Sequence, residues 1–271
     1  MLGGLTWERR PIDPLPGPRR LDEVSGARML HAAVALAGPD ASGPGGFRFA
    51  EGRMAELLGE PTVLVDPTGG PAAIAAGLEA ACRELDCDVV VLLDVGGDVL
   101  AHGHEPGLGS PLADALVLAA APALAASGVT VIGAVFGSGC DGELLPREVA
   151  ARLDEVAAAG GALGDVAVDP ATLDRLAAAV AAVPTEASAM ALRCARGETG
   201  DVPIRDGRRT VTLTAAGGRV FFFDPEVAIR SAARLAAAVR DASDLEDAQR
   251  ILEAMGVATE LSYERGAAAT G

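Results

Sequence analysis

Three segments of the chain share one pattern: a short apolar run, a polar glycine-rich loop, and a helical stretch that opens with proline. The apolar runs are Thr62–Val65, Val89–Leu93 and Val129–Phe136. Short runs of consecutive branched apolar residues are typical of parallel strands that are buried on both faces. Because strand, loop and helix repeat three times, the sequence predicts one α/β domain. Its sheet is expected to be mostly parallel with helices on both faces, a Rossmann-like three-layer arrangement.

We expect the loops after these strands to gather at one edge of the sheet. Right-handed crossovers bring the carboxyl ends of successive parallel strands together, and open α/β sheets hold their ligand crevice at that edge. The expected crevice is lined by acidic residues: Asp66, Asp94, Asp98, Glu105, Asp114, Asp141 and Glu143. The domain is expected to span residues 1–271, with a frayed tail over 264–271.

The remaining patterns predict less regular elements. The helix that opens at Pro111 is apolar almost all round, so it should be deeply buried, with a kink at Pro122. Arg209–Thr214 alternates with the period of a half-buried strand, and together with Arg219–Phe223 it predicts a C-terminal β-hairpin followed by helices. Pro39–Gly46 is predicted to be a loop.

Composition excludes several classes of function. The net charge of −16 in 271 residues disfavours nucleic acid and anionic membrane surfaces as partners. All 22 basic residues are arginine, which disfavours pyridoxal phosphate and a Walker-A nucleotide site, since both use a lysine. No apolar run reaches the length of a membrane helix, and the four cysteines form no C-x-x-C pair. A cytoplasmic protein with a small-molecule ligand is expected, and a homo-oligomer is compatible with these features.

The loop after Leu93 carries the densest group of chemically active side chains, namely Asp94, Asp98, His102, His104 and Glu105. Carboxylates and imidazoles so placed suit acid–base chemistry or a divalent cation. Asp98 and His102 are candidate metal ligands together with Asp141. Gly96 and Gly97 permit close backbone approach to a ligand. The alternative interpretation is that Asp94 and Asp98 only anchor the loop through backbone N–H groups.

The loop after Phe136 contains Asp141 and Glu143. Its glycines match G-x-G-x-x-G, but two carboxylates at that position oppose a dinucleotide pyrophosphate, so a cation or a cationic substrate fits better. Ser110 and Asp114 open the Pro111 helix. They are interpreted either as a cap and a favourable first-turn charge, or as part of the site.

Two further segments are candidate binding elements. Thr68, Gly69 and Gly70 precede a helix, where free N–H groups attract anions, although a simple tight turn is the alternative. Trp7 and Arg9 lie in an arginine-rich stretch near the start of the chain, which could neutralise an acidic substrate. A core tryptophan and a solvated loop are the alternatives.

These observations favour an enzyme that acts on a small polar metabolite by hydrolysis or group transfer. The carboxylates would serve as general acid and base or as Mg²⁺ ligands. The alternative is a non-catalytic metabolite-binding or regulatory protein that uses the same cleft. A third hypothesis, a scaffold subunit, predicts an exposed apolar patch in place of a polar cleft.

Several of these strings together resemble an uncharacterised prokaryotic family, the domain of unknown function DUF1152. The resemblance depends on five segments that span nearly the whole chain: Trp7–Arg19, Leu93–Leu116, Gly139–Leu144, Pro184–Ser188 and Phe221–Glu226. The family supplies no reaction, so the resemblance implies only that these polar strings are characteristic of it.

The chain departs from this family in two places. The resemblance implies a first strand, a glycine-rich acidic loop and a helix, whereas Leu2–Leu5 looks like the end of a second strand. The first βα unit is therefore expected to be missing, which would leave a central position of the sheet without its strand. The resemblance also implies an acidic residue at the position of His104, which weakens the hypothesis of a two-histidine metal site.

Overall fold

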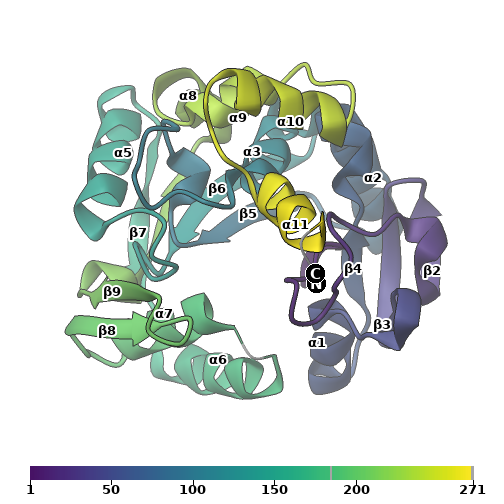
Figure 1. The fold of residues 1–271 in the computed structure, drawn as a ribbon, viewed down its shortest axis with the longest axis horizontal. Coiled ribbons are helices and arrows are strands. Elements are labelled where there is room, and N and C mark those ends of the chain that lie inside the picture. Colours follow the sequence, from purple (N-terminus) through teal and green to yellow (C-terminus); the bar gives the residue numbers. More distant parts are fainter. Residues whose placement is uncertain (184, 270–271) are drawn as a thin grey trace.

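The computed structural model describes residues 1–183 and 185–269, and Figure 1 shows their arrangement. The first of two four-stranded sheets has the order β1-β4-β3-β2. Its strands are β1 (Gly3–Leu5), β2 (Ser25–His31), β3 (Val34–Ser42) and β4 (Thr62–Val65). β1 lies parallel to β4, whereas β3 is antiparallel to both of its neighbours. The predicted loop Pro39–Gly46 is therefore partly strand.

The second sheet has the order β5-β6-β10-β7. Its strands are β5 (Val89–Val95), β6 (Thr130–Phe136), β7 (Ala162–Ala167) and β10 (Arg219–Phe223). β5 and β6 are parallel over seven residue pairs, while β10 is antiparallel to both β6 and β7. Both sheets are thus mixed, and the expectation of a mostly parallel Rossmann-like sheet is not confirmed.

The predicted hairpin between Arg209–Thr214 and Arg219–Phe223 is wrong. β9 (Arg209–Leu213) pairs with β8 (Gly200–Ile204) in a separate two-stranded hairpin. β10 instead fills the position between β6 and β7. The prediction paired β10 with β9 because the two are neighbours in sequence. In the structure, β10 pairs instead with β6 on one side and with β7 on the other, and so satisfies the backbone groups of both strands.

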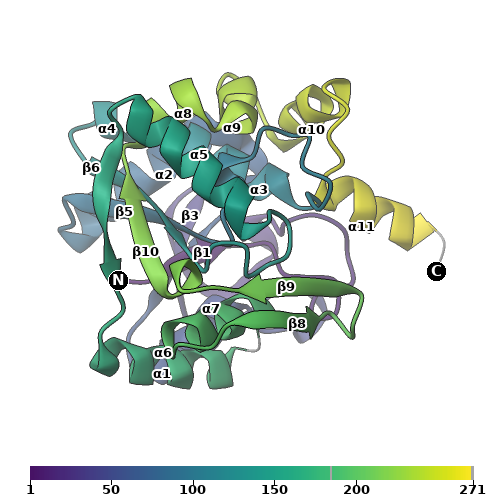
Figure 2. The same cartoon turned by 90° about the vertical axis from the view of Figure 1, so that its left-hand side faces the viewer.

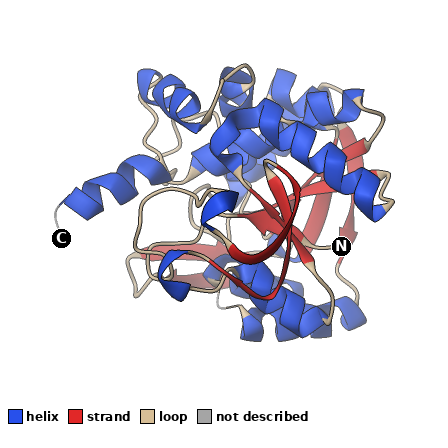
Figure 3. Cartoon of the chain, turned by 90° about the vertical axis from the view of Figure 1, so that its right-hand side faces the viewer, coloured by secondary structure: helices blue, strands red, loops and turns tan. Residues whose placement is uncertain are grey.

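Helices lie on both sides of the strands. Figures 2 and 3 show one larger and one smaller group of helices with the strands between them. The larger group contains α2 (Gly70–Leu85), α3 (Pro111–Ala119), α4 (Ala121–Ala126), α5 (Pro146–Ala158), α8 (Pro225–Ser231), α9 (Arg234–Val239) and α10 (Leu245–Ala254). The smaller group contains α1 (Ala50–Leu58), α6 (Pro170–Ala182) and α7 (Glu186–Ala195).

α11 (Glu260–Ala269) projects to one side of the molecule (Figure 2). The tail that we expected to be frayed is therefore helical from Glu264 to Ala269, and residues 270–271 lie outside the described part, as does Pro184. None of the helices in the described residues combines the length and apolar character needed to cross a membrane.

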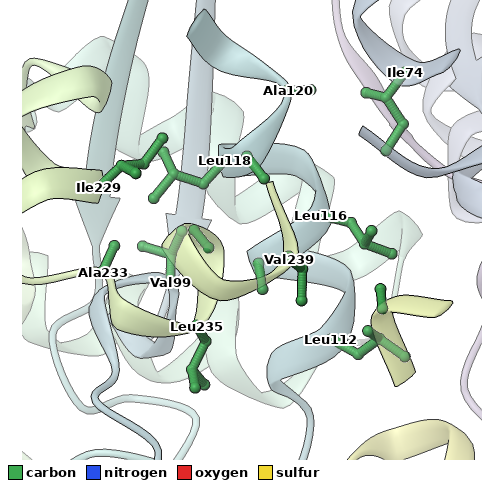
Figure 4. Close-up of a cluster of buried hydrophobic side chains, with 14 of the residues drawn as sticks. Ile74, Val99, Leu112, Leu116, Leu118, Ala120, Ile229, Ala233, Leu235 and Val239 are labelled. Carbon is green, nitrogen blue, oxygen red and sulfur yellow. The ribbon is translucent and has the colours of Figure 1, made fainter. Parts of the chain in front are cut away.

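The main apolar core is built around α3. Leu112, Leu116 and Leu118 of this helix are completely or almost completely buried, and they pack among residues of α8 and α9 such as Ile229 and Val239 (Figure 4). The predicted irregularity at Pro122 is present, because α3 ends at Ala119 and α4 begins at Ala121. A proline lacks the N–H that would continue the helical ladder. The burial of Leu112, Leu116 and Leu118 fixes the position of α3, and the first turn of this helix carries Asp114.

A cavity of about 300 Å³ lies between the two sheets, and we call it the interstrand cavity. It is lined by Met1–Leu5 on one side, by Val89–Leu93 of β5 on the other, and by residues of α2 and α3. β1 and β5 are the adjoining edge strands of the two sheets. In the described part of the chain no strand lies between them.

Candidate functional site

The parallel pair β5–β6 brings two acidic loops together. Asp94 lies near the end of β5, and Asp98 follows in a short 3-10 helix. Asp141 lies in the loop after β6. The two loops are hydrogen-bonded to each other, since the Gly139 N–H donates to the Gly96 carbonyl at 2.7 Å. Gly96 has a φ of +150°, and a Cβ there would lie 2.5 Å from the Asp141 carboxyl carbon.

Five carboxylates converge at this edge in two overlapping groups. Oxygens of Asp98, Asp141 and Glu143 lie within 4.8 Å of one another, and so do oxygens of Asp94, Asp98 and Asp114. Asp98 belongs to both groups. We call these five residues the carboxylate cluster. Four of them are buried, and Asp114 is partly buried.

Three members of the carboxylate cluster accept hydrogen bonds from the loops. The Gly97 N–H donates to Asp94 at 2.7 Å, and the Glu143 N–H donates to Asp141 at 3.1 Å. Glu143 accepts from the Gly109 and Ser110 N–H groups at 2.7 and 2.8 Å, and from the Ser110 hydroxyl at 2.5 Å. Ser110 therefore binds Glu143, and its hydroxyl does not cap α3.

No hydrogen bond to the side chain of Asp98 is found among the described residues; 5% of the residue's surface is exposed, and its oxygens are not among the fully buried atoms that lack a partner. Burial raises its pKa well above the ordinary value, and the charges of Asp114 and Asp94 raise it further. A buried carboxylate without a donor is costly unless it is protonated or paired with a cation. Asp98 therefore marks the position where positive charge would be most stabilising.

Burial and neighbouring negative charges also raise the pKa values of Asp94, Asp141 and Asp114. Burial raises the pKa of Asp94 to about 6 and that of Asp141 to about 7, with the Glu143 charge contributing to both. Burial and the Asp94 charge raise the pKa of Asp114 well above its ordinary value. Like charges at this spacing cannot all ionise at neutral pH without a compensating cation.

Glu105 and the two histidines lie apart from the carboxylate cluster. Glu105 accepts hydrogen bonds from the backbone N–H groups of His102, Gly103 and His104. Although burial opposes the shift, these bonds hold the pKa of Glu105 below its ordinary value. The imidazole of His102 contacts Glu155 at 2.9 Å and also Arg152, both on α5. The expected metal set of Asp98, His102 and Asp141 is therefore divided: Asp98 and Asp141 meet, while His102 groups with His104 and Glu105.

The candidate residues before α2 lie in the turn that follows β4 of the first sheet. Asp66 accepts from the Thr68 N–H at 2.8 Å and from the Leu21 N–H at 3.1 Å, so it fixes the turn after β4. Gly69 and Gly70 continue this turn, and Gly70 has a positive φ of 74°. None of these residues belongs to the carboxylate groups found in the described part of the chain.

A large pocket of about 1220 Å³ opens beside the carboxylate cluster. Its walls come from the segment around Arg9, from the β8–β9 hairpin and from α11, and its lining includes Ser110 and Glu143. Trp7 is not part of the lining; its indole N–H donates to Glu264 at 3.2 Å, which ties this segment to α11. The pocket thus joins residues from three distant parts of the sequence.

Two kinds of pocket residue were not anticipated. Arg205 and Arg209 of the hairpin lie 3.8 and 3.6 Å from a Glu143 oxygen. Glu260 of α11 accepts from the Leu112 and Ala113 N–H groups at the start of α3, and burial raises its pKa to about 7. The run Arg205–Arg209 holds three arginines in a strongly acidic chain, which is a signal that could have identified the first kind.

The site combines the carboxylate cluster with the arginines of the β8–β9 hairpin that line the adjoining pocket. Carboxylate oxygens are the ligands that Mg²⁺ and Mn²⁺ prefer, and arginines favour phosphate or carboxylate groups. The donor set around Asp98 therefore suits a hard divalent cation, and the pocket beside it combines arginines with carboxylates.

Comparisons with known proteins give a family but no activity. No curated protein and no solved structure matches the chain. A family model described as protein of unknown function (DUF1152) matches residues 1–268. The chain therefore belongs to the DUF1152 family.

Proposed function

We propose that this protein is an enzyme that binds a divalent cation, with Mg²⁺ as the first candidate, and carries out hydrolysis or group transfer on a small anionic metabolite. The observation that carries the proposal is the buried side chain of Asp98, which lacks a hydrogen-bond donor among the described residues and lies within 4.8 Å of carboxylate oxygens in both groups. The pKa values of the cluster are raised by burial first and by mutual repulsion second, and a cation there offsets the repulsion.

The residues of the carboxylate cluster divide into two roles. Asp98, Asp141 and Glu143 would hold the cation, with Asp94 and Asp114 completing its surroundings. A bound divalent cation supplies Lewis-acid activation of a substrate oxygen or of water. Without the cation, burial raises the pKa of Asp141 to about 7. As a ligand of the cation, Asp141 would be ionised.

The pocket supports an anionic substrate. Arg205 and Arg209 stand on its wall, and their contacts with Glu143 are too long for hydrogen bonds, at 3.8 and 3.6 Å. Their guanidinium groups can therefore turn to a phosphate or carboxylate group of a bound molecule without breaking a short ion pair.

The test of the metal site is calorimetric titration of the full chain with Mg²⁺, Mn²⁺, Ca²⁺ and Zn²⁺ in a buffer free of chelators. We expect saturable binding of Mg²⁺ or Mn²⁺, and a loss of affinity of at least about tenfold in Asp98→Asn. The matched control is Asp241→Asn, which removes one carboxylate whose side chain is 95% exposed. Absence of binding in the unmodified protein, or equal binding by Asp98→Asn, would contradict the proposal.

One observation favours the alternative of a non-catalytic metabolite-binding or regulatory protein. Glu143 accepts three hydrogen bonds from Gly109 and Ser110, and these bonds hold the loop before α3 in place without any ligand. The two functions differ in the effect of Asp141→Asn. An enzyme should lose turnover of a metabolite identified by mass-spectrometric screening while it still binds that molecule, whereas a binding protein has no turnover to lose.

A further inference from the structure

Two buried cysteine thiols face each other outside the carboxylate cluster. The sulfur of Cys140 lies 3.7 Å from the sulfur of Cys194. Cys140 belongs to the loop after β6 and Cys194 lies near the end of α7, 54 positions further along the chain. The two residues are 0% and 3% exposed. The fold therefore brings together two thiols that are far apart in the sequence.

The surroundings of this pair are apolar. Phe136 at the end of β6 and Leu213 of β9 belong to the same buried cluster as the two cysteines. Gly217 lies against the pair, because a Cβ there would be 2.7 Å from the Cys194 sulfur and 3.4 Å from the Cys140 sulfur. Within the described part of the chain, neither cysteine belongs to a group of three potential metal ligands. The pair is therefore suited to thiol–thiol chemistry rather than to metal binding.

The two sulfurs need only a small movement to form a bond. A disulfide has an S–S length of about 2.0 Å, so sulfurs that are 3.7 Å apart need to approach by about 1.7 Å. Cys140 lies in a turn, which shifts more readily than the helix that holds Cys194. The sulfur of Cys87 instead contacts the Leu85 carbonyl at 3.6 Å. Among the described residues, Cys140 and Cys194 form the one pair of sulfurs within hydrogen-bond distance.

The environment of Cys194 favours its reactive form. Hydrogen bonding with Cys140 lowers the pKa of the Cys194 thiol to about 7, although burial opposes the shift. The Thr214 backbone N–H and the Arg193 charge lower this pKa as well. The thiolate, not the thiol, is the nucleophile in thiol oxidation. Cys194 is therefore the sulfur that reacts first with an oxidant.

We propose that Cys140 and Cys194 form a reversible disulfide when the protein meets a small peroxide, and that this bond fixes the loop that carries Asp141 to α7. The Cys194 thiolate attacks one peroxide oxygen and the O–O bond breaks, which leaves a sulfenic acid on Cys194 and a hydroxide that takes up a proton. The Cys140 sulfur then attacks the sulfenic sulfur. The S–S bond forms, and the sulfenic hydroxyl leaves with the Cys140 proton as water. With hydrogen peroxide, two thiols lose two electrons and two protons, and the peroxide becomes two waters.

The position of the pair connects its redox state to the candidate site. Cys140 immediately precedes Asp141, a member of the carboxylate cluster. The same loop is hydrogen-bonded to the loop after β5 through Gly139 and Gly96, at 2.7 Å. A disulfide at Cys140 therefore restrains the segment that places Asp141. An effect on cation binding would rest on the proposed function, whereas disulfide formation does not.

The test treats the folded full chain with hydrogen peroxide, then unfolds it, alkylates the remaining thiols and measures the mass of the protein. Before alkylation, we expect the mass to fall by two hydrogen atoms, and two of the four cysteines should then escape alkylation. Digestion after acidic residues places the four cysteines in separate peptides, so mass spectrometry identifies the two that are joined. Dithiothreitol should restore four reactive thiols. The same treatment of the chain unfolded in urea is expected to give mixed pairings, because the fold no longer selects the partners.

Three variants separate the pair from the other cysteines. Cys140→Ser and Cys194→Ser should each lose the disulfide. Cys87→Ser is the matched control at a partly exposed cysteine, and it should form the disulfide as the unmodified protein does. Cys140→Ser should gain one oxygen at Cys194, since no second thiol condenses with the sulfenic acid. Circular dichroism and thermal unfolding check that the variants are folded.

Three outcomes would overturn the proposal: four reactive thiols after peroxide treatment, joined peptides that contain Cys82 or Cys87 in place of the pair, or oxidation of Cys194 to sulfinic acid without a disulfide. Equal disulfide formation in Cys140→Ser and Cys87→Ser would overturn it as well. None of these measurements involves a metal or a substrate, so failure here is distinct from failure of the proposed enzyme.

Discussion

At the scale of single residues, the candidate site depends on how closely two loops approach. Gly96 has a positive φ, a backbone conformation that residues other than glycine rarely adopt. A Cβ added at Gly96 would contact the Asp141 carboxyl group. Asp141 accepts a hydrogen bond from the Glu143 N–H at 3.1 Å. Substitution of Gly96 therefore acts through two separate causes, backbone strain and displacement of a carboxylate.

We expect Gly96→Ala to lower the free energy of unfolding by about 1 to 3 kcal/mol from backbone strain alone, with a further loss from the contact with Asp141. The matched control is Gly128→Ala, since Gly128 also has a positive φ but nothing within 4 Å of the added carbon. Urea unfolding of both variants measures the difference. If Gly128→Ala is as destabilised as Gly96→Ala, the close approach of the two loops contributes nothing.

At the scale of elements, α3 is organised by a residue far away in the sequence. Glu260, the first residue of α11, accepts from the Leu112 N–H at 3.1 Å and from the Ala113 N–H at 2.8 Å. The first N–H groups of a helix have no partner within it, so a carboxylate at this position satisfies them. α11 thus stabilises the helix that carries Asp114.

We expect Glu260→Ala to destabilise the protein by about 1 to 2 kcal/mol, because two helix N–H groups lose their acceptor. Glu260→Gln retains one acceptor oxygen but places its amide NH₂ against the other N–H, so it should lose at least half of that amount. Thermal unfolding measures both values, and hydrogen exchange of the Leu112 and Ala113 amides locates the effect. Unchanged exchange of these amides in Glu260→Ala would contradict the assigned role.

The elements that the sequence predicted well are those with a strong local pattern. Thr62–Val65 is a buried strand, as its continuous apolar run predicts, whereas Val89–Leu93 is a strand in which Val89, Val91 and Leu93 are exposed. The loops after β5 and β6 meet as expected. β7 was missed because Ala162–Ala167 is rich in small residues and exposed throughout. β10 was assigned to a neighbour in sequence, although its partners are set by strand edges elsewhere in the molecule.

The same limit applies to the candidate site. Asp98 and Asp141 could be predicted to meet, because each follows one strand of a parallel pair. Glu260 and Arg209 could not, since they reach the site from α11 and from the hairpin, and no local spacing connects those elements to β5. Glu105 lies outside the carboxylate cluster, and the three N–H groups that bind it lie within its own loop.

At the scale of the whole molecule, buried carboxylates link stability to pH. The folded-state pKa values of Asp94, Asp141 and Glu260 are raised to about 6, 7 and 7, above the values of about 4 in an unfolded chain. The folded state therefore binds more protons than the unfolded state between these pH values. Stability falls as pH rises through this interval, and Glu51, whose pKa burial raises to about 8, extends the fall beyond pH 7.

We expect the thermal midpoint of the metal-free protein to decrease between about pH 4 and pH 7, and Asp98→Asn to flatten part of that decrease. Asp98→Asn removes a carboxyl group whose own pKa is raised well above the ordinary value by burial and by the charges of Asp114 and Asp94. The control is Asp241→Asn, which changes the net charge equally at an exposed position and should keep the full slope. Differential scanning fluorimetry in chelator across this range measures the slopes. Parallel slopes for all three proteins would refute the assignment.

The separation between β1 and β5 also has a mechanical consequence. Within the described residues no backbone ladder connects the two sheets, so a force that pulls them apart is resisted by helix packing, including that of α2 against α3 and of α1 against α6. Side-chain packing yields in smaller steps than a ladder of hydrogen bonds that must break together. We therefore expect the two sheets to separate locally at a lower free energy than is needed to open either sheet itself.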